Sequence, residues 1–252
     1  MCIRDSYGRD TFLAIRHLGT ARLPALFAWK DRVDGWFRRV GLRNVADKTL
    51  QAATRIGPSH LPKRLTHYRD RFEHHLMLRV ATADANATEA LLTQVMGAGE
   101  GAFFRCTREE GDAAFIHRFA AAGAAVRYRT VHAREVADIV ALDIALRRND
   151  AAWFETLPAE LEAAISHKFY YGHFFCHVFH QDYVIRAGHD PLAIEHAMWA
   201  LLDARGAEYP AEHNVGHLYK AKPALTDHYR ALDPTNSFNP GTGHTSKLAH
   251  WR

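Results

Sequence analysis

The segment His75-Leu-Met-Leu-Arg-Val-Ala81 is the starting point for predicting the fold class, together with the two segments that follow it. Its apolar side chains predict a strand, residues 83–96 then place Ala, Leu and Val at helical spacing, and Gly101-Ala-Phe-Phe-Arg-Cys106 predicts a second strand. Thr107 begins a further helix, because Glu110 stands three residues later in the pattern of a capping box. Strands that alternate with helices of these lengths predict an α+β fold.

Further elements are expected downstream from the same signals. Residues 136–146 are apolar enough for a helix or a buried strand, and periodicity does not decide between the two. Helical spacing recurs in residues 157–165 and 191–205. The aromatic and β-branched run 169–185 predicts one or two strands, and residues 209–219 are expected to be extended again.

Upstream, residues 11–42 carry apolar side chains at three- and four-residue steps, which predicts helices. Gly19 and Pro24 interrupt the pattern, so two or three short helices are expected instead of one long one. The opposite positions carry Arg and Lys, while Trp29 and Trp36 add amphipathic rings. Such helices suit the plane of a membrane surface, and ordinary surface helices packed on a core share the same composition.

The charge of the chain is unevenly distributed. Residues 1–73 hold 15 Lys and Arg against 7 Asp and Glu, a net +8, whereas the remainder holds 17 against 21, a net −4. A basic block of this kind can face nucleic acid, anionic lipid or solvent. The segment 58–62 contains two prolines and leads into the polar stretch 63–71, which together predict a linker and a domain boundary near residue 72.

Composition excludes several classes of protein. No apolar run approaches the roughly 20 residues that cross a bilayer, and the first residues lack the apolar core of a signal peptide. Three scattered cysteines are too few for a disulfide framework or a thiolate zinc site, and they fit a reducing compartment.

The chemistry is expected around Glu212 and His213, which stand side by side in the segment Tyr209-Pro-Ala-Glu-His-Asn-Val-Gly-His217. With His173 and His180 they offer carboxylate and imidazole groups, which bind zinc or iron and, for histidine, move protons near neutral pH. Histidines in strands are nevertheless more often packed and hydrogen-bonded residues than ligands.

The spacing of the two upstream histidines sets a geometric condition. Seven positions separate His173 from His180, and side chains of a straight strand alternate between faces, so the two would point in opposite directions. A bulge or corner must therefore intervene if both bind one ion. On a straight strand, His177 would share a face with His173.

Several segments resemble a known family: Glu73-His-His75, residues 117–128, 142–150, 170–176, 178–183, 209–221 and 233–241. They resemble the C-terminal half of the quinone-dependent, FAD-containing D-lactate dehydrogenases of bacteria. The resemblance runs from about Tyr7 to the end of the chain. It leaves out residues 1–6, which are expected to be a non-native leader.

The resemblance implies three parts. Residues 1–72 would form a basic, mainly helical membrane-binding module, to which residues 111–134 could also belong. Residues 73–208 would form a ferredoxin-like cap, with an antiparallel sheet and helices on one face. Residues 209–252 would return to an FAD-binding domain that this sequence does not contain.

The resemblance also implies an activity and its residues. The family oxidises D-lactate to pyruvate and passes electrons to quinone, as a peripheral enzyme on the cytoplasmic face of the bacterial inner membrane. Related flavin-dependent D-2-hydroxyacid dehydrogenases carry a Gly-His, six residues, His pattern followed by Glu-His. By that pattern His173, His180 and Glu212 match ligands of a divalent metal such as zinc or iron, and His213 matches the catalytic base. The six residues here are Phe-Phe-Cys-His-Val-Phe, where the related group has a glycine-rich spacer.

Substrate and flavin contacts are expected elsewhere in the chain. The carboxylate of D-lactate calls for a guanidinium, and Arg147 or Arg148 of the cap is the candidate, although each is more often a surface charge. Asn239, in Asn-Pro-Gly, is expected to touch FAD through the returning C-terminal segment, unless it forms an ordinary Asx turn.

Two other functions fit parts of the sequence. Without an FAD-binding domain, the polypeptide would be a non-catalytic membrane-binding and cap fragment. A basic N-terminal part could instead bind duplex DNA, with a steep dependence on salt. The resemblance favours an anionic phospholipid surface over nucleic acid as the partner.

Overall fold

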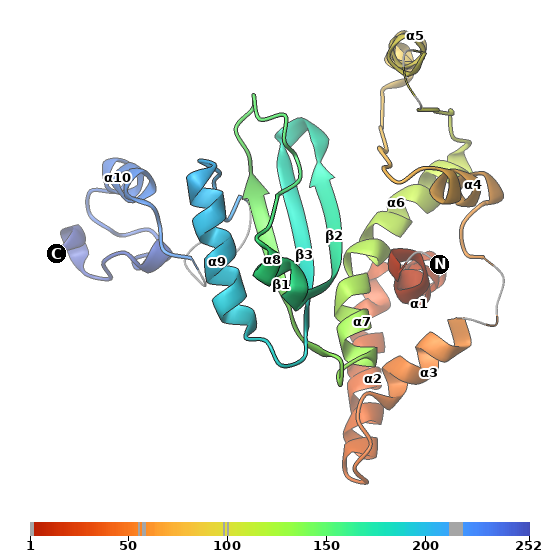
Figure 1. Cartoon of the computed structure of the whole chain (residues 1–252), viewed down its shortest axis with the longest axis horizontal. Coiled ribbons are helices and arrows are strands. Elements are labelled where there is room, and N and C mark those ends of the chain that lie inside the picture. The colour runs from red at the N-terminus through yellow and green to blue at the C-terminus, as the bar shows by residue number, and fades with distance from the viewer. Residues whose placement is uncertain (1–2, 55, 57–58, 98, 100, 212–218) are drawn as a thin grey trace. The chain divides into compact units, whose positions relative to one another are not determined.

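The computed structural model describes residues 3–54, 56, 59–97, 99, 101–211 and 219–252 (Figure 1). The chain forms two compact units, residues 1–131 and residues 132–252. Within the described residues, no helix is both long enough and apolar enough to cross a membrane.

The first unit is helical. Its elements are α1 (Ile3–Leu18), a 3-10 turn (Thr20–Arg22), α2 (Leu23–Arg38), α3 (Val45–Thr54), α4 (Lys63–Arg71), a 3-10 turn (Thr82–Asp84), α5 (Ala85–Met96), α6 (Arg108–Ala122) and α7 (Ala124–Val131). The break between α1 and α2 falls at Gly19, whose φ of 75° ends the first helix, and Pro24 stands in the first turn of the second. The predicted division of residues 11–42 into short helices is therefore confirmed.

Helix α1 is the centre of this unit and packs against α3, α6 and α7. Phe12 is completely buried and packs with Leu61 and with Ala113 and Ala120 of α6. Gly8 allows the close approach, because a Cβ at this position would lie 2.5 Å from the carbonyl oxygen of Ala120. The small residues of α6 and α7 thus serve packing.

A buried ion cluster ties four helices of the first unit together. The guanidinium of Arg127 on α7 pairs with Asp10 of α1 and, at 2.8 Å, with Asp47 of α3. Lys30 of α2 also pairs with Asp47, at 2.9 Å. Because buried charges are stable only when they are paired, these contacts fix how α2 and α3 lie against α1 and α7.

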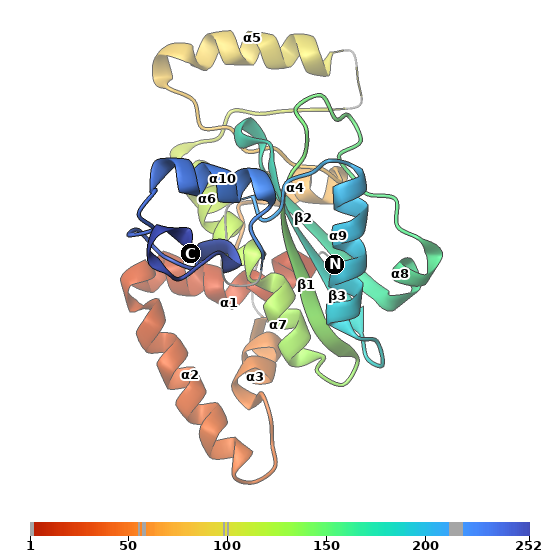
Figure 2. The same ribbon diagram turned by 90° about the vertical axis from the view of Figure 1, so that its left-hand side faces the viewer.

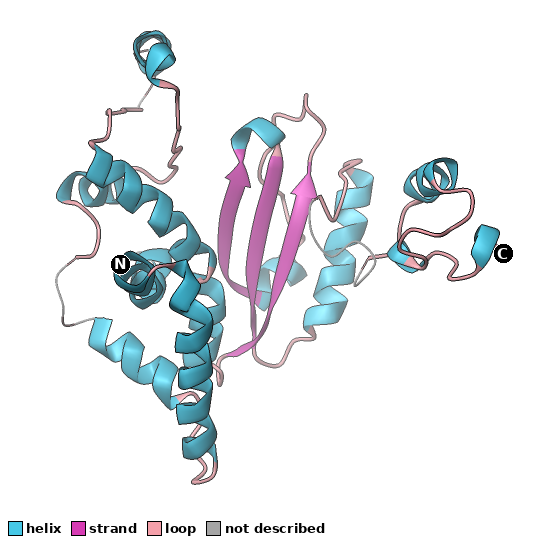
Figure 3. Cartoon of the chain, turned by 180° about the vertical axis from the view of Figure 1, so that it is seen from behind, coloured by secondary structure: helices cyan, strands magenta, loops and turns pink. Residues whose placement is uncertain are grey.

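The two strands predicted on either side of α5 do not form. Residues 75–81 and 101–106 have no regular secondary structure and lie outside any sheet of the described chain, as the loops flanking α5 in Figure 3 show. A strand needs a neighbouring strand to satisfy its backbone groups, and the described residues supply none here. The predicted helix 83–96 is confirmed as α5, and the polar stretch 63–71 is helix α4 and not a linker.

The second unit contains the sheet. Its elements are β1 (Val136–Ala145), α8 (Ala159–Ala164), β2 (Ile165–His173), a 3-10 turn (Phe174–Cys176), β3 (Val178–Arg186), α9 (Pro191–Ala204), α10 (Pro223–Leu232) and two 3-10 turns (Thr242–His244 and Ala249–Trp251). The strands are antiparallel in the order β1-β3-β2. The run 136–146 is thereby resolved as a strand, and residues 169–185 belong to two strands.

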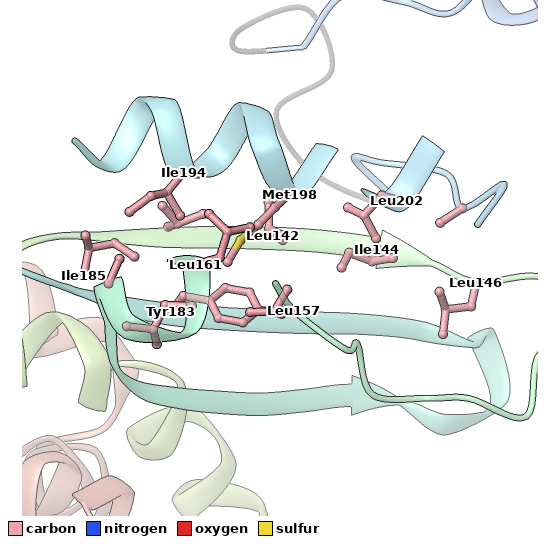
Figure 4. Packing of buried hydrophobic residues seen from close by; sticks show 14 residues of the cluster. Leu142, Ile144, Leu146, Leu157, Leu161, Tyr183, Ile185, Ile194, Met198 and Leu202 are labelled. Carbon is pink, nitrogen blue, oxygen red and sulfur yellow. The ribbon is translucent and has the colours of Figure 1, made fainter. Parts of the chain in front are cut away.

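One face of this sheet carries the core. Alternate residues of β1 and β3 point to it and pack under α8 and α9 (Figure 4). The main members are Val140, Leu142, Ile144, Leu161, Tyr183, Ile185, Ile194, Met198 and Leu202. Because side chains alternate along a strand, Asp143, His180 and Asp182 point to the opposite face. Helices together with an antiparallel sheet confirm the predicted α+β class.

Candidate functional site

The β2–β3 hairpin brings the two predicted histidines together. His173 is the last residue of β2, and His180 is the third residue of β3 after the turn Phe174–Cys176. Their ring centroids are 5.3 Å apart and the rings meet edge to face. The hairpin is the corner that their spacing requires, so both lie on one face although seven positions separate them.

His180 also faces a carboxylate on the neighbouring strand. Asp143 of β1 lies directly across from His180 in the register of the sheet, and its Oδ1 is 3.3 Å from His180 Nδ1. The side chain of Asp143 is 12% exposed and that of His180 is 29% exposed. A carboxylate beside Nδ1 fixes the orientation and tautomer of an imidazole, and it makes Nε2 the better ligand or base.

Asp143 is the functional candidate that sequence reasoning missed. It stands in an apolar strand between Leu142 and Ile144, both of which are buried in the core. The only indication in the sequence was one carboxylate between two apolar residues. Its position could not be interpreted from sequence, because residues 136–146 could be a helix or a strand, and only a strand places residue 143 on the face opposite Leu142 and Ile144.

A second carboxylate lies on the same face. Asp182 pairs in register with Ala141 of β1 and Phe169 of β2, so it occupies the central strand. Burial raises the pKa of its carboxyl group to about 6. Burial, followed by the charge of Arg186, lowers the pKa of His167 on the same face.

His177 does not belong to this group, contrary to the expectation that it shares a face with His173. Its φ is 58°, it lies between the turn and β3, and its Nδ1 is 3.2 Å from the carbonyl oxygen of Leu146. Its ring contacts Trp153 and Phe179, and Phe179 packs against the core. The left-handed residue turns this side chain toward the core face of the sheet.

The two candidate arginines follow the end of β1. Arg147 and Arg148 are both exposed. The guanidinium of Arg147 lies against Gly206, where φ is 64° and an added Cβ would meet the guanidinium at 2.3 Å. Arg205 holds this loop to the end of α9 by pairing with Asp150 at 3.0 Å.

The segment that carries the predicted base begins at this end of β1. Glu208 forms an antiparallel bridge with Ala145, and the amide of Ala211 donates to the carbonyl oxygen of Asp143 at 2.9 Å. Glu212 and His213, predicted as ligand and base, lie outside the described residues.

Asn239 lies in a compact turn of the C-terminal segment. Its φ is 51°, and its carbonyl oxygen accepts hydrogen bonds from the amide and hydroxyl of Thr242. The turn is supported by Asp233, whose Oδ2 accepts from the amide of Phe238 at 2.7 Å. That hydrogen bond is the main reason why the pKa of Asp233 is lowered. A role of Asn239 toward FAD stays a prediction.

The sequence matches, over residues 1–251, the family described as D-lactate dehydrogenase, membrane binding. The chain belongs to this family. It is 51% identical over 252 residues to the quinone-dependent D-lactate dehydrogenase of Escherichia coli (strain K12), and 49% identical over 256 residues to that of Haemophilus influenzae. A third relative of the same name, from Corynebacterium glutamicum, is 42% identical over 253 residues.

These alignments cover the chain and the relatives unequally. Each includes 99% of this chain but only 44%, 45% and 44% of the three relatives, in the order given. The chain therefore spans less than half the length of the D-lactate dehydrogenases that it matches.

The residues of this family member meet part of the requirement for a metal site. His173 and His180 are two imidazole donors on adjacent strands, and Asp143 supports one of them. Within the described ranges, no group of three His, Cys, Asp or Glu side chains could hold an ion. Two of the three predicted ligands thus lie together, and Glu212 is the one that is not described.

Proposed function

We propose that this chain is the membrane-binding and substrate-covering part of a peripheral, FAD-dependent D-lactate dehydrogenase that passes electrons to quinone. The observation that carries the proposal is the family match over residues 1–251, joined to D-lactate dehydrogenase relatives at about half identity. The basic first unit would bind anionic lipid on the cytoplasmic face of the inner membrane, and the second unit would face the substrate.

The catalytic base in this proposal is His213, which takes the proton from the hydroxyl of D-lactate. Its support is that Ala211, two residues earlier, is hydrogen-bonded to Asp143, which itself faces His180. The chemistry that a bound FAD would supply is that of an acceptor for the hydride on Cα of the substrate. His173, His180 and Glu212 would hold a zinc or iron ion beside the base, with Asp143 orienting His180.

Arg147 or Arg148 would bind the carboxylate of D-lactate. A guanidinium offers two parallel N–H donors to a carboxylate, which an ammonium cannot match. The support is position, since both arginines follow the strand that carries Asp143, and Arg147 is held against Gly206.

The proposed domain organisation is the one that the resemblance to D-lactate dehydrogenases implies. Residues 1–72 would be the membrane-binding module, to which residues 111–134 could also belong, and residues 73–208 would be a ferredoxin-like cap. The coverage of one sheet face by α8 and α9 supports the cap.

Residues 209–252 would dock on the FAD-binding domain, where Asn239 would touch the flavin. The support is that Phe238, Leu232 and Leu248 are 81%, 72% and 61% exposed.

The alternative function is that of a membrane-binding and cap fragment without catalysis of its own. The two are separated by purifying the chain and recording its flavin absorbance. A colourless chain is expected, because the proposal places most FAD contacts outside it. Bound flavin together with D-lactate oxidation by the 252 residues would instead show an autonomous enzyme.

The role of His213 is tested in a protein extended to the full length of the relatives. His213→Ala should lower kcat for D-lactate oxidation by about 10² to 10⁴ while flavin stays bound, because a positioned base contributes that much. His177→Ala is the matched control, since this histidine packs against Trp153 and Phe179. Near-normal turnover of the His213 variant would remove this residue from the mechanism.

A further inference from the structure

Helix α2 is held in the first unit by one side only. On its inner side Lys30 pairs with Asp47 at 2.9 Å, and Asp34 accepts a hydrogen bond from the amide of Ala46 at 2.8 Å. Both contacts reach α3, which returns antiparallel to α2 after a turn at residues 39–44. Figure 2 shows α2 and α3 as the two arms of a helical hairpin that meet at this turn.

One exposed edge of α2, beside the side that contacts α3, carries apolar side chains that packing does not explain. Trp29, Trp36 and Val40 follow one another at steps of seven and four residues, which places them along one line of the helix and its continuation. Their exposed fractions are 55%, 61% and 64%, and Leu42 in the turn is 52% exposed. We call these four residues the apolar stripe. Exposed apolar residues that gather in this way mark an interaction surface.

Arginines flank the apolar stripe. Arg32 and Arg39 stand beside it on α2 and Arg43 lies in the turn, and all three are exposed. In the part of the chain that the structure describes, none of the three forms an ion pair, whereas Lys30 on the inner side does. The segment 23–43 holds five Lys and Arg against two Asp, one of which, Asp34, is buried.

We propose that the apolar stripe inserts into an anionic phospholipid bilayer, at the boundary between headgroups and acyl chains, while Arg32, Arg39 and Arg43 bind lipid phosphates. Indole rings prefer this boundary, and guanidinium groups complement phosphate geometry. The inference rests on the proposed membrane function and deepens it. It states that α2 and the turn after it insert into the bilayer. A basic surface without the apolar stripe would only adsorb to the lipid headgroups.

Two variants of the full chain distinguish insertion from adsorption. The measurement is the partition of the protein into phosphatidylcholine vesicles, prepared either with or without phosphatidylglycerol. Trp29→Ser with Trp36→Ser should weaken binding to the anionic vesicles at least about tenfold, because two indole rings that would be buried in the bilayer are lost. The triple change of Arg32, Arg39 and Arg43 to Gln should weaken it by about 100-fold, and only when anionic lipid is present.

Matched controls remove equally exposed side chains elsewhere. Phe175→Ser with Leu192→Ser deletes two apolar groups that are 85% and 56% exposed in the second unit. Arg108→Gln deletes a charge of α6 whose side chain is 97% exposed. Both controls should bind the vesicles as the unchanged chain does. An equal loss in the controls would show a diffuse surface and overturn the assignment to α2.

Fluorescence gives an independent readout. Addition of anionic vesicles should shift the tryptophan emission to shorter wavelength, and lipids brominated on their acyl chains should quench it. Trp29→Phe with Trp36→Phe keeps apolar rings, so binding should persist while shift and quenching disappear. Retention of the shift in this variant would place the inserted indole elsewhere and overturn the proposal.

The remaining outcomes distinguish the two proposals. If the chain binds anionic vesicles and Trp29→Ser with Trp36→Ser binds equally well, insertion is wrong and the membrane function stands. If the unchanged chain does not bind, both fail. A dimer without lipid that the same variant converts to monomer would show that a second copy covers the stripe, which also overturns insertion.

Discussion

Asp182 is a carboxyl group in the middle of a sheet, with Ala141 and Phe169 as its cross-strand neighbours. Burial disfavours its charged form and raises its pKa from 3.8 to about 6. The folded protein therefore binds this proton more tightly than the unfolded chain does. Below the unfolded pKa the group is neutral in both states and costs nothing, whereas above the folded pKa its ionisation opposes folding.

Removing this carboxylate should stabilise the second unit near neutral pH. Asp182→Asn is expected to raise the free energy of unfolding by about 3 kcal/mol at about pH 7 and to leave it unchanged near about pH 3, because the penalty develops as pH rises from the unfolded pKa to the folded pKa. Urea unfolding of both proteins across that pH range measures the difference. A gain that is equal at both ends of the range would mean that ionisation of Asp182 is not its cause.

Helix α6 begins at a complete capping box. The hydroxyl of Thr107 accepts from the amide of Glu110 at 3.2 Å, and the carboxylate of Glu110 accepts from the amide of Thr107 at 2.8 Å. Arg64 of α4 also binds that carboxylate, and the hydrogen bond from Arg64 is the main reason why the pKa of Glu110 is lowered. This start of α6 is therefore both a cap and a link to α4.

Loss of the cap should destabilise the first unit. Thr107→Ala is expected to cost about 1 kcal/mol of unfolding free energy, since one amide of the first turn loses its acceptor. Thermal unfolding measures the change. Thr88→Ala in α5 is the control, because its hydroxyl donates to the carbonyl oxygen four residues earlier and does not cap the helix. Equal effects at the two positions would assign the loss to helix propensity and not to the cap.

The elements that the sequence predicts well are those whose signals are local. Helical spacing in residues 83–96 and 191–205, and the capping box at Thr107, need no information from the rest of the chain. Residues 75–81 have the composition of a strand, yet a strand forms only beside a partner, and none is present among the described residues. Residues 136–146 are a strand because β3 pairs with them, which their apolar run could not show.

The site follows the same rule. His173 and His180 were predicted together, but only the hairpin explains how they share a face. Asp143 could not be predicted, because its contact with His180 depends on the register of β1 against β3. His177 was assigned to the wrong face, because its left-handed backbone interrupts the alternation that a continuous strand would impose.

The two units of the molecule carry net charges of opposite sign. Residues 1–131 contain 21 Lys and Arg and 13 Asp and Glu, a net +8, and residues 132–252 contain 11 and 15, a net −4. The net positive charge of the first unit comes from residues 1–73. Residues 74–131 add no net charge, because their positive and negative side chains are equal in number. A membrane module that ends near residue 72 stays a prediction, and the helices that pack on α1 extend to residue 131.

This charge makes the salt dependence of vesicle binding a test of how the molecule meets a membrane. Attraction between a +8 unit and anionic lipid should weaken steeply as salt rises, because at about 0.5 M the screening length is only a few ångströms. Burial of Trp29, Trp36, Val40 and Leu42 is not screened, so a measurable fraction of the chain should still sediment with anionic vesicles at that salt. Trp29→Ser with Trp36→Ser should lose this residual fraction while keeping most of the salt-sensitive part. Complete release of the unchanged chain at high salt would show that charge alone holds it to the bilayer.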